Sequence, residues 1–219
     1  MSKQHLSIKI PQQMLPKQQM QYPEDVMNES CPQIVDPRIR RTRQLLQQAL
    51  EKLLTTKEFD KISVQDISEA ATVNRATFYD HYPDKFALLN CLVATRFQDL
   101  LAARGVGFDG SCSSALKALA LGLCDYLAEQ RHLEPPMESA VIGVVRGMIL
   151  NGSKSHPSSG HVSVEMIASA ISWAMYGAAL EWLRTPNRAP SEDFAETLVT
   201  LVSPIFPSAP HESGAIHAS

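Results

Sequence analysis

The residues whose side chains could do chemistry together lie in one stretch, NRATFYDHYPDKF, which spans residues 74–86. Tyr79 and His81 can donate hydrogen bonds to phosphate oxygens, and Arg75 can donate two parallel hydrogen bonds to a guanine edge. Lys85 is expected in the first turn of a helix, where a cation meets the positive end of the helix dipole. A bound phosphate would make that placement favourable. The stretch therefore predicts contacts with both the backbone and the bases of a nucleic acid.

Two capping signals define the first helices that would support this stretch. Asp36-Pro37 predicts a helix that ends near Thr55, because aspartate caps helix N-termini and proline suits the first turn. Ser63 begins the sequence SVQD, which resembles a capping box and predicts a second helix over about 63–71. A helix of about two turns is too short to be stable alone, so it depends on tertiary packing.

A third and a fourth helix are expected to follow without a long loop. Asn74 caps the third helix after the tight linker Thr72-Val73, and Pro83 is expected to begin a fourth helix that runs to about Arg104. Two short helices joined by such a turn match a helix-turn-helix, whose second helix enters the major groove N-terminus first. Thr77 and its neighbours at the front of the third helix would then face base edges, where its methyl group could meet a thymine methyl.

The charge distribution separates one basic segment from an acidic remainder. The chain has a formal net charge of -3, but residues 36–104 carry +2 and residues 105–219 carry -5. Such asymmetry often indicates that one part contacts nucleic acid. Taken singly, an arginine run is more often a solvated surface, and Tyr79 or Tyr82 an ordinary core residue. Their combination with capped short helices favours an interface.

No metal centre, cofactor or catalytic site is expected. The four cysteines form no C-x-x-C pair, and His156 and His161 lie in a predicted loop without acidic or cysteine partners, so zinc is not indicated. The chain has no Gly-rich phosphate loop, nucleophile elbow or paired acidic motif. We therefore expect that the protein is not an enzyme.

The sequence predicts a cytoplasmic protein without membrane segments. Cys91 and Cys124 lie among apolar residues at helical spacing and are interpreted as buried free thiols. The first residues lack the long apolar stretch of a signal peptide. The longest uncharged run, Met166 to Leu180, is too short to span a bilayer.

The C-terminal part of the chain predicts four more helices, over about 112–130, 137–150, 163–184 and 191–202. The third of these is apolar on nearly every side and must be buried. It could pair with its copy in a second subunit as a four-helix bundle, together with the last helix. The alternative is burial within one subunit. The candidate dimer-interface residues are Ala170, Ala174, Ala178, Leu198 and Leu201.

A pocket for a small-molecule effector could lie between these helices. Its candidate lining residues are large and apolar or aromatic, and they occur at helical spacing. Residues of this kind are more often plain core, so this alternative stays open. The candidates are Tyr126, Met148, Trp173 and Tyr176.

The span from about Arg40 to Leu92, which contains FDKISVQDISEAATVNRATFYDHYPDKFALL, resembles the DNA-binding domain of TetR/AcrR-type transcriptional regulators. The resemblance implies an all-α fold with an N-terminal three-helix helix-turn-helix domain and a C-terminal helical effector and dimerisation domain. We expect a flexible extension over 1–35, the DNA-binding domain over 36–84, the ligand-binding and dimerisation domain over 85–203, and a disordered tail over 204–219.

The resemblance also implies which residues contact a double-stranded DNA operator. Carried over by position, the groove-facing residues are Gln65, Asn74, Arg75, Ala76 and Thr77, and the phosphate-holding residues are Tyr79, His81 and Lys85. Arg41 and Ser63 are further candidate DNA contacts. One departure concerns Thr72, which occupies a turn position often filled by glycine in this family. A β-branched residue tolerates positive φ poorly, so this turn is expected to be strained or altered.

The function indicated is a transcriptional regulator, specifically a homodimeric repressor that binds a palindromic operator and is released by a small molecule. An alternative is an interaction protein, such as a co-regulator with weak DNA binding. Salt dependence distinguishes the two, because phosphate contacts make affinity fall steeply with salt.

Overall fold

The structure, a computed structural model, describes residues 36–105, 113–130, 133–153 and 162–203. All regular structure in these ranges is helical, so the predicted all-α class is confirmed. The expected extension 1–35 and tail 204–219 lie outside the described residues, as does the loop with His156 and His161.

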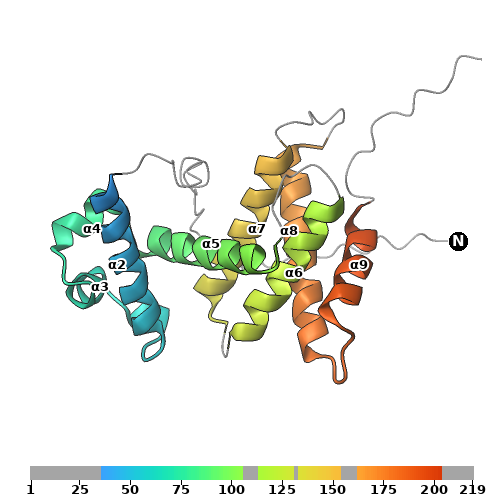
Figure 1. The fold of residues 1–219 in the computed structure, drawn as a ribbon, viewed down its shortest axis with the longest axis horizontal. Coiled ribbons are helices and arrows are strands. Elements are labelled where there is room, and N and C mark those ends of the chain that lie inside the picture. Colours follow the sequence, from blue (N-terminus) through green and yellow to red (C-terminus); the bar gives the residue numbers. More distant parts are fainter. Residues whose placement is uncertain (1–35, 106–112, 131–132, 154–161, 204–219) are drawn as a thin grey trace, which may run out of the picture. The chain divides into compact units, whose positions relative to one another are not determined.

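The described helices form an N-terminal group, a connecting helix and a C-terminal group (Figure 1). The N-terminal group consists of α2 (Pro37–Leu54), the one-turn 3-10 helix η2 (Phe59–Lys61), α3 (Val64–Ala70) and α4 (Arg75–His81). The connecting helix is α5 (Lys85–Ala103). The C-terminal group consists of α6 (Ser113–Glu129), α7 (Pro135–Ser153), α8 (Val164–Arg184) and α9 (Ser191–Val202).

The capping signals of the first two helices are confirmed. The Asp36 carboxylate accepts a hydrogen bond from the Arg38 amide at 2.8 Å, at the start of α2. At the start of α3, the Asp66 amide donates to the Ser63 hydroxyl at 3.1 Å, and the Ser63 amide donates to the Asp66 carboxylate at 2.8 Å. These bonds complete a capping box. The Ser63 hydroxyl and amide hold the pKa of the Asp66 carboxyl well below its usual range, with a smaller contribution from Lys57.

The turn between α3 and α4 is strained at the residue that the sequence singled out. Thr72 has φ 58°, in the left-handed region. A non-glycine residue there costs on the order of 1 kcal/mol. The turn is closed by two backbone bonds, from the Thr72 amide to the Glu69 carbonyl at 3.1 Å and from the Val73 amide to the Ser68 carbonyl at 3.0 Å. The expected effect of a β-branched residue at this position is confirmed.

The start of α5 differs from the prediction. Pro83 was expected to begin this helix, but Asp84 is the N-cap residue and Lys85 the first helical residue. The Asp84 carboxylate accepts a hydrogen bond from the Ala87 amide at 2.8 Å. Aspartate satisfies an unpaired amide at the helix start, which proline cannot do, and this explains why the boundary lies two residues later.

Helix α5 packs against both groups, with α2 near one end and α6 and α7 near the other (Figure 1). Its length and composition would also suit a membrane span. Its buried residues Leu88, Val93 and Phe97 belong to the hydrophobic core of the protein, which accounts for that composition. At its far end, the Arg104 guanidinium donates to Asp125 of α6 at 2.7 Å and to Glu192 of α9 at 3.0 Å.

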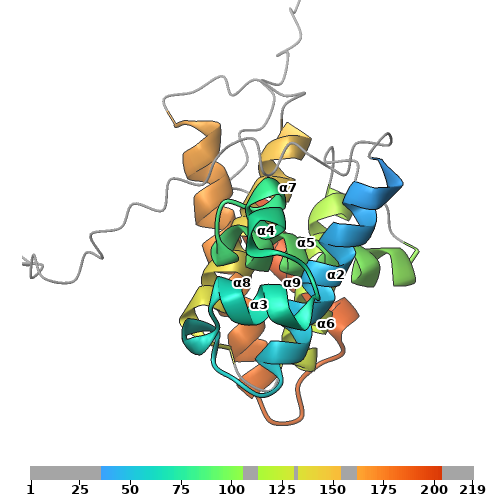
Figure 2. The same cartoon turned by 90° about the vertical axis from the view of Figure 1, so that its left-hand side faces the viewer.

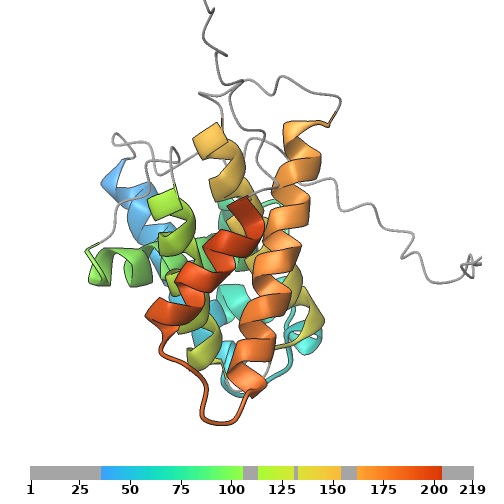
Figure 3. The same ribbon diagram turned by 90° about the vertical axis from the view of Figure 1, so that its right-hand side faces the viewer.

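The C-terminal helices lie close to their expected ranges. The helix expected over 137–150 begins two residues earlier, because Pro135 and Pro136 form its first turn, where proline is tolerated. The helix expected over 191–202 has these bounds, and its N-cap residue is Pro190. Helix α8 lies beside α9 (Figure 3). Met166 of α8 is 63% exposed and Trp173 is 57% exposed, so α8 is not fully buried within one subunit, which was the alternative to burial against a second subunit.

Candidate nucleic-acid interface

The candidate interface lies on α4, which presents one face to solvent and packs the other against α2 and α3 (Figure 2). Phe78 is fully buried, and it holds α4 against the core of the N-terminal group. Asn74, Arg75 and Ala76 are exposed at the front of the helix, and Thr77 is half-buried beside them. The front of α4 therefore carries the four residues that were predicted to face base edges.

Asn74 has a structural role as well as an exposed position. Its side-chain carbonyl accepts a hydrogen bond from the Ala76 amide at 2.9 Å, which caps α4. This bond fixes the side chain and leaves the amide N–H groups of Asn74 as donors. The helix cap therefore already fixes the side-chain orientation from which Asn74 could contact a DNA groove.

Arg75 and Tyr79 contact each other along the exposed face of α4. The Arg75 guanidinium donates to the Tyr79 hydroxyl at 3.2 Å and lies 5.6 Å from the centre of its ring. Tyr79 is 47% exposed, and its ring packs edge-on against Phe78. The residue predicted to contact a base and the residue predicted to contact a phosphate thus form one polar pair.

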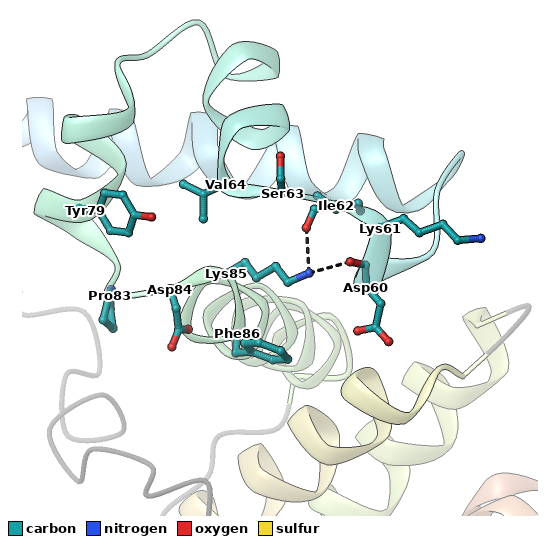
Figure 4. A pocket seen from close by; sticks show the side chains of 10 residues that line it. All are labelled: Asp60, Lys61, Ile62, Ser63, Val64, Tyr79, Pro83, Asp84, Lys85 and Phe86. Atoms are coloured by element: carbon teal, nitrogen blue, oxygen red, sulfur yellow. Dashed lines mark hydrogen bonds between the residues drawn. The ribbon is translucent and has the colours of Figure 1, made fainter. Parts of the chain in front are cut away.

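Lys85 has partners that the sequence did not predict. Its ammonium group donates to the backbone carbonyls of Phe59 at 2.9 Å, Asp60 at 3.2 Å and Ile62 at 2.8 Å (Figure 4). It also lies 4.6 Å from the centre of the Phe59 ring. An ammonium group has three donors, and all three have acceptors here. Carbonyls of η2 and the residue after it, instead of a phosphate, therefore compensate this cation in the structure, which differs from the expected phosphate contact.

An open cleft of about 360 Å³ lies beside Lys85, between the start of α3 and the start of α5 (Figure 4). Tyr79 of α4 borders the cleft on one side, and Lys61 and Ser63 border it on the other. The cleft places hydroxyl and ammonium groups around one solvent-open space. The Tyr79 hydroxyl and the Lys61 ammonium on this rim can donate to phosphate oxygens, whereas the carboxylates of Asp60 and Asp84 lie on the same rim and would repel a phosphate.

His81, at the end of α4, is half-buried. Burial lowers the pKa of His81, and the positive charge of Arg43 lowers it further. His81 is therefore neutral at pH 7, with one ring N–H to donate. The Arg43 guanidinium also lies 5.9 Å from the centre of the Tyr82 ring.

The other predicted DNA contacts lie on α2 and α3. Arg41 is exposed on α2. Gln65 is exposed on α3, where its side-chain amide donates to the Glu69 carboxylate at 2.6 Å. The Ser63 hydroxyl donates to Asp66 at 2.6 Å within the capping box, so its oxygen is held close to the start of α3.

The candidate dimer residues divide between the surface and the core. Ala170 and Ala174 are exposed on α8, and Ala178 is half-buried. Leu201 is 67% exposed on α9, whereas Leu198 is 2% exposed. Leu198 therefore packs inside the subunit and is not available to a second copy, contrary to the prediction.

The candidate pocket residues also divide. Tyr126 and Tyr176 are buried, and burial raises the pKa of each to about 12. Met148 is half-buried against the core. Trp173 lies on the open side of α8 with Ala170 and Ala174, so its predicted place in an internal pocket is wrong. Helical spacing alone could not distinguish the two sides of a helix that is apolar almost all round.

Sequence reasoning missed two residues that shape the site. Asp84 caps α5, and an aspartate just before a predicted helix was an available signal for this. Glu134 accepts a hydrogen bond from the Phe59 amide at 2.8 Å, over a separation of 75 residues. No local signal could predict the second contact. Among the described residues, no group of three His, Cys, Asp or Glu side chains is arranged to hold a metal ion.

Comparison with known proteins finds relatives of the segment that contains α3 and α4. Residues 46–92 match the sequence profile of the tetR family of bacterial regulatory proteins. Over these residues the chain is similar to the N-terminal part of tetR-family regulators. The matched residues run from the buried half of α2 through α3 and α4 into α5, so the tetR-family match covers the candidate interface.

Two curated relatives match the same region. The uncharacterized HTH-type transcriptional regulator YxbF of Bacillus subtilis is 35% identical over 91 residues, which are 40% of this chain and 24% of that protein. The HTH-type transcriptional regulator EthR of Mycolicibacterium smegmatis is 38% identical over 64 residues, 29% of this chain and 28% of that protein. The chain thus matches about a quarter of the length of these relatives.

The likeness in fold extends beyond residues 46–92. The crystal structure of a TetR-family regulator from Streptomyces coelicolor aligns with a TM-score of 0.56 at 18% sequence identity. The alignment covers 78% of this chain and 97% of that chain. At this sequence identity, what the two proteins share is the arrangement of their helices.

Proposed function

We propose that the protein is a transcriptional regulator that binds double-stranded DNA through α3 and α4 in the cytoplasm. The observation that carries the proposal is the polar, exposed front of α4, where Asn74 and Arg75 lie on a short helix held by the buried Phe78. A helix presented in this way fits the major groove, while the preceding helix braces against the backbone. The tetR-family match covers the same residues.

Within this proposal, residues 36–84 form the DNA-binding domain and residues 85–203 the effector and dimerisation domain. Arg75 and Thr77 contact base edges. Phosphates are held by residues near the start of α2 and on α4. These are Arg41, Tyr79 and His81. We leave Lys85 and Ser63 out of the phosphate set, because the three donors of Lys85 are bound to backbone carbonyls and the Ser63 hydroxyl donates to Asp66.

The protein acts as a homodimer on a palindromic operator. The support is the open side of α8 and α9, where Met166, Trp173 and Leu201 are all more than half exposed. An isolated subunit would leave these large apolar side chains in water. A two-fold pairing of this surface would present two copies of α4 to two half-sites on one face of the duplex.

Replacing Leu201 by aspartate tests the dimer. Because Leu201 is 67% exposed, the subunit should keep its fold, while the charged residue should weaken self-association. Sedimentation equilibrium measures the association, and circular dichroism measures the fold. Asp193→Asn, an exposed change in the first turn of the same helix, is the control. A Leu201→Asp protein that associates as strongly as the wild type would show that this surface is not the interface.

The output is repression that a small molecule relieves. Helix α5 supports this proposal, because it begins beside α4 and ends bonded to α6 and α9 through Arg104. A ligand between the C-terminal helices could therefore favour a conformer in which the two copies of α4 are wrongly spaced. It could do so only if it binds that conformer more tightly.

The first experiment is selection of random duplex DNA on the purified full chain. Recovered duplexes are titrated again at several salt concentrations. We expect a palindromic consensus and a steep fall of affinity with salt, because phosphate contacts release counterions. Weak binding to every duplex with no enrichment would reject sequence-specific recognition and favour a protein-interaction role. Arg75→Ala should change the preferred sequence, whereas an equal loss on every duplex would contradict its base contact.

A further inference from the structure

The segment η2 joins α2 to α3 and is bonded to charged groups from two other helices. It is a single 3-10 turn, closed by a bond from the Ile62 amide to the Phe59 carbonyl at 3.1 Å. A turn this short leaves amides unpaired at its start and carbonyls unpaired at its end. Phe59 is fully buried, so its polar backbone groups require partners within the protein.

Those partners come from the starts of α5 and α7. The Glu134 carboxylate accepts a hydrogen bond from the Phe59 amide at 2.8 Å, at the positive end of the turn. The Lys85 ammonium donates to the carbonyls of Phe59, Asp60 and Ile62 at the negative end. An anion at the N-terminus and a cation at the C-terminus both complement the dipole of the turn. We call these four hydrogen bonds the η2 clamp.

Each charged residue of the η2 clamp is held by its own helix. The Glu134 carbonyl accepts a bond from the Glu138 amide at 3.0 Å, which places Glu134 immediately before α7, where its carbonyl accepts the first hydrogen bond of the helix. Pro135 follows it and restricts its backbone to extended conformations. Lys85 is the first residue of α5, after the Asp84 cap. A movement of α7 would therefore carry the Glu134 carboxylate with it.

The η2 clamp also lies next to the start of the helix-turn-helix. Ser63, the N-cap of α3, follows Ile62 directly, and its amide and hydroxyl both bond Asp66. Phe59 packs edge-on against Phe86 of α5 at 5.2 Å between ring centres. A shift of η2 would thus be passed to α3 through one covalent step, and to α4 through the packing of α3 on α4.

We infer that Glu134 is a positioning residue, which fixes the orientation of α3 and α4 relative to α7 through the Phe59 amide. This inference rests on the proposed DNA-binding function for its consequence, but the contact itself can be tested without DNA. In a dimer, the spacing of two recognition helices depends on how rigidly each is held to its own C-terminal group. Loss of the Glu134 bond should therefore affect two half-sites bound together more than one half-site bound alone.

The test compares Glu134→Ala and Glu134→Gln with Glu138→Ala, a matched control on the same helix one turn later. Hydrogen exchange at the Phe59 amide is measured on the full chain without DNA. We expect exchange to rise by about tenfold in Glu134→Ala, because the amide loses its acceptor. Glu134→Gln keeps an acceptor oxygen and should restore most of the protection, and Glu138→Ala should leave it unchanged.

The same proteins are then titrated with the selected palindromic duplex and with a duplex in which one half-site is scrambled. Glu134→Ala should weaken binding to the palindrome by about tenfold, a typical coupling between sites, and leave binding to the single half-site unchanged. An equal loss on both duplexes would mean a merely structural role and would overturn the inference, as would unchanged exchange at Phe59. Failure of the wild type to bind any duplex would instead reject the proposed function, and exchange would still decide whether Glu134 holds η2.

Discussion

The N-terminal group of helices and the C-terminal group are held by different kinds of interaction. In the N-terminal group, α2, α3 and α4 each begin at a side-chain cap, supplied by Asp36, Ser63 and Asn74. In the C-terminal group, α8 also begins at a side-chain cap, Ser163, but its long helices bury more apolar surface, and ion pairs join distant segments, such as Arg104 with Glu192 over a separation of 88 residues. Local signals therefore determine where the short helices begin, whereas only packing determines which face of a long apolar helix is buried.

This contrast has a functional consequence within the proposal. The short helices α3 and α4 bury few residues, Ile67 and Ser68 in α3 and Phe78 in α4, and this leaves the polar front of α4 exposed. The long helices α8 and α9 instead expose large apolar side chains to solvent, such as Trp173, which is 57% exposed. One group thus offers a polar surface suited to DNA, and the other an apolar surface suited to a second subunit.

The largest effect is expected from two adjacent residues of α4 that differ in burial, Phe78 with 0% and Tyr79 with 47% exposure. Phe78→Ala should destabilise the protein by about 3–5 kcal/mol, because it removes a fully buried aromatic side chain. Tyr79→Phe should leave stability almost unchanged and weaken binding to every duplex, because only an exposed hydroxyl is lost. Urea unfolding and duplex titration measure the two properties. A Tyr79→Phe protein as unstable as Phe78→Ala would contradict this division of α4.

Lys85→Met tests whether this lysine stabilises the fold or binds phosphate. We expect a loss of about 2 kcal/mol in unfolding free energy, because hydrogen bonds from a charged donor to three carbonyls disappear. The slope of duplex affinity against salt should stay the same. Arg41→Met is the control, since it should reduce that slope by about one and leave stability unchanged. A reduced salt slope in Lys85→Met would restore the phosphate role that the sequence predicted.

Two residues with positive φ, one in each group, allow a matched comparison. Thr72 has φ 58° in the turn before α4, and Asn187 has φ 54° between α8 and α9. Thr72→Gly should stabilise the protein by about 0.5–1 kcal/mol, because glycine adopts this conformation without strain. Asn187→Gly should gain less, because asparagine tolerates the left-handed region better than a β-branched residue. Urea midpoints measure both, and an equal gain would show that side-chain shape at Thr72 contributes no strain.

The smallest effect concerns pH. Burial, and then the charge of Arg43, lower the pKa of His81 in the folded protein below its ordinary value of 6.5. The unfolded chain therefore binds more protons than the folded chain between the folded pKa and 6.5. The stabilising contribution is present above pH 6.5 and is lost as pH falls below it. His81→Gln should reduce the acid-side loss by a few tenths of a kcal/mol, on the scale of partly exposed groups. Urea midpoints at pH 5.5 and 7.5 measure this, and an unchanged pH dependence would contradict it.

The parts of the fold that could be predicted are those with signals within a few residues. The capping box at Ser63 and the cap at Asn74 were predicted correctly, and so was the strain at Thr72. The start of α5 was placed two residues early because Pro83 outweighed Asp84 in the prediction. In the candidate site, exposure of Arg75 and Tyr79 agrees with their expected positions, but the hydrogen bond between them was not foreseen.

The sequence by itself determined the all-helical class, the starts of α2, α3 and α4 and the polar front of α4, because each depends on residues at fixed short spacing. Only the tertiary structure decided that Leu198 is buried, that Trp173 is exposed, and that Lys85 bonds η2 instead of standing free. It also brought Glu134 to the Phe59 amide across 75 residues. These outcomes depend on which surfaces pack together in the folded protein. The spacing of apolar residues along a helix shows that the helix has an apolar side, but it does not show which other helix packs against that side.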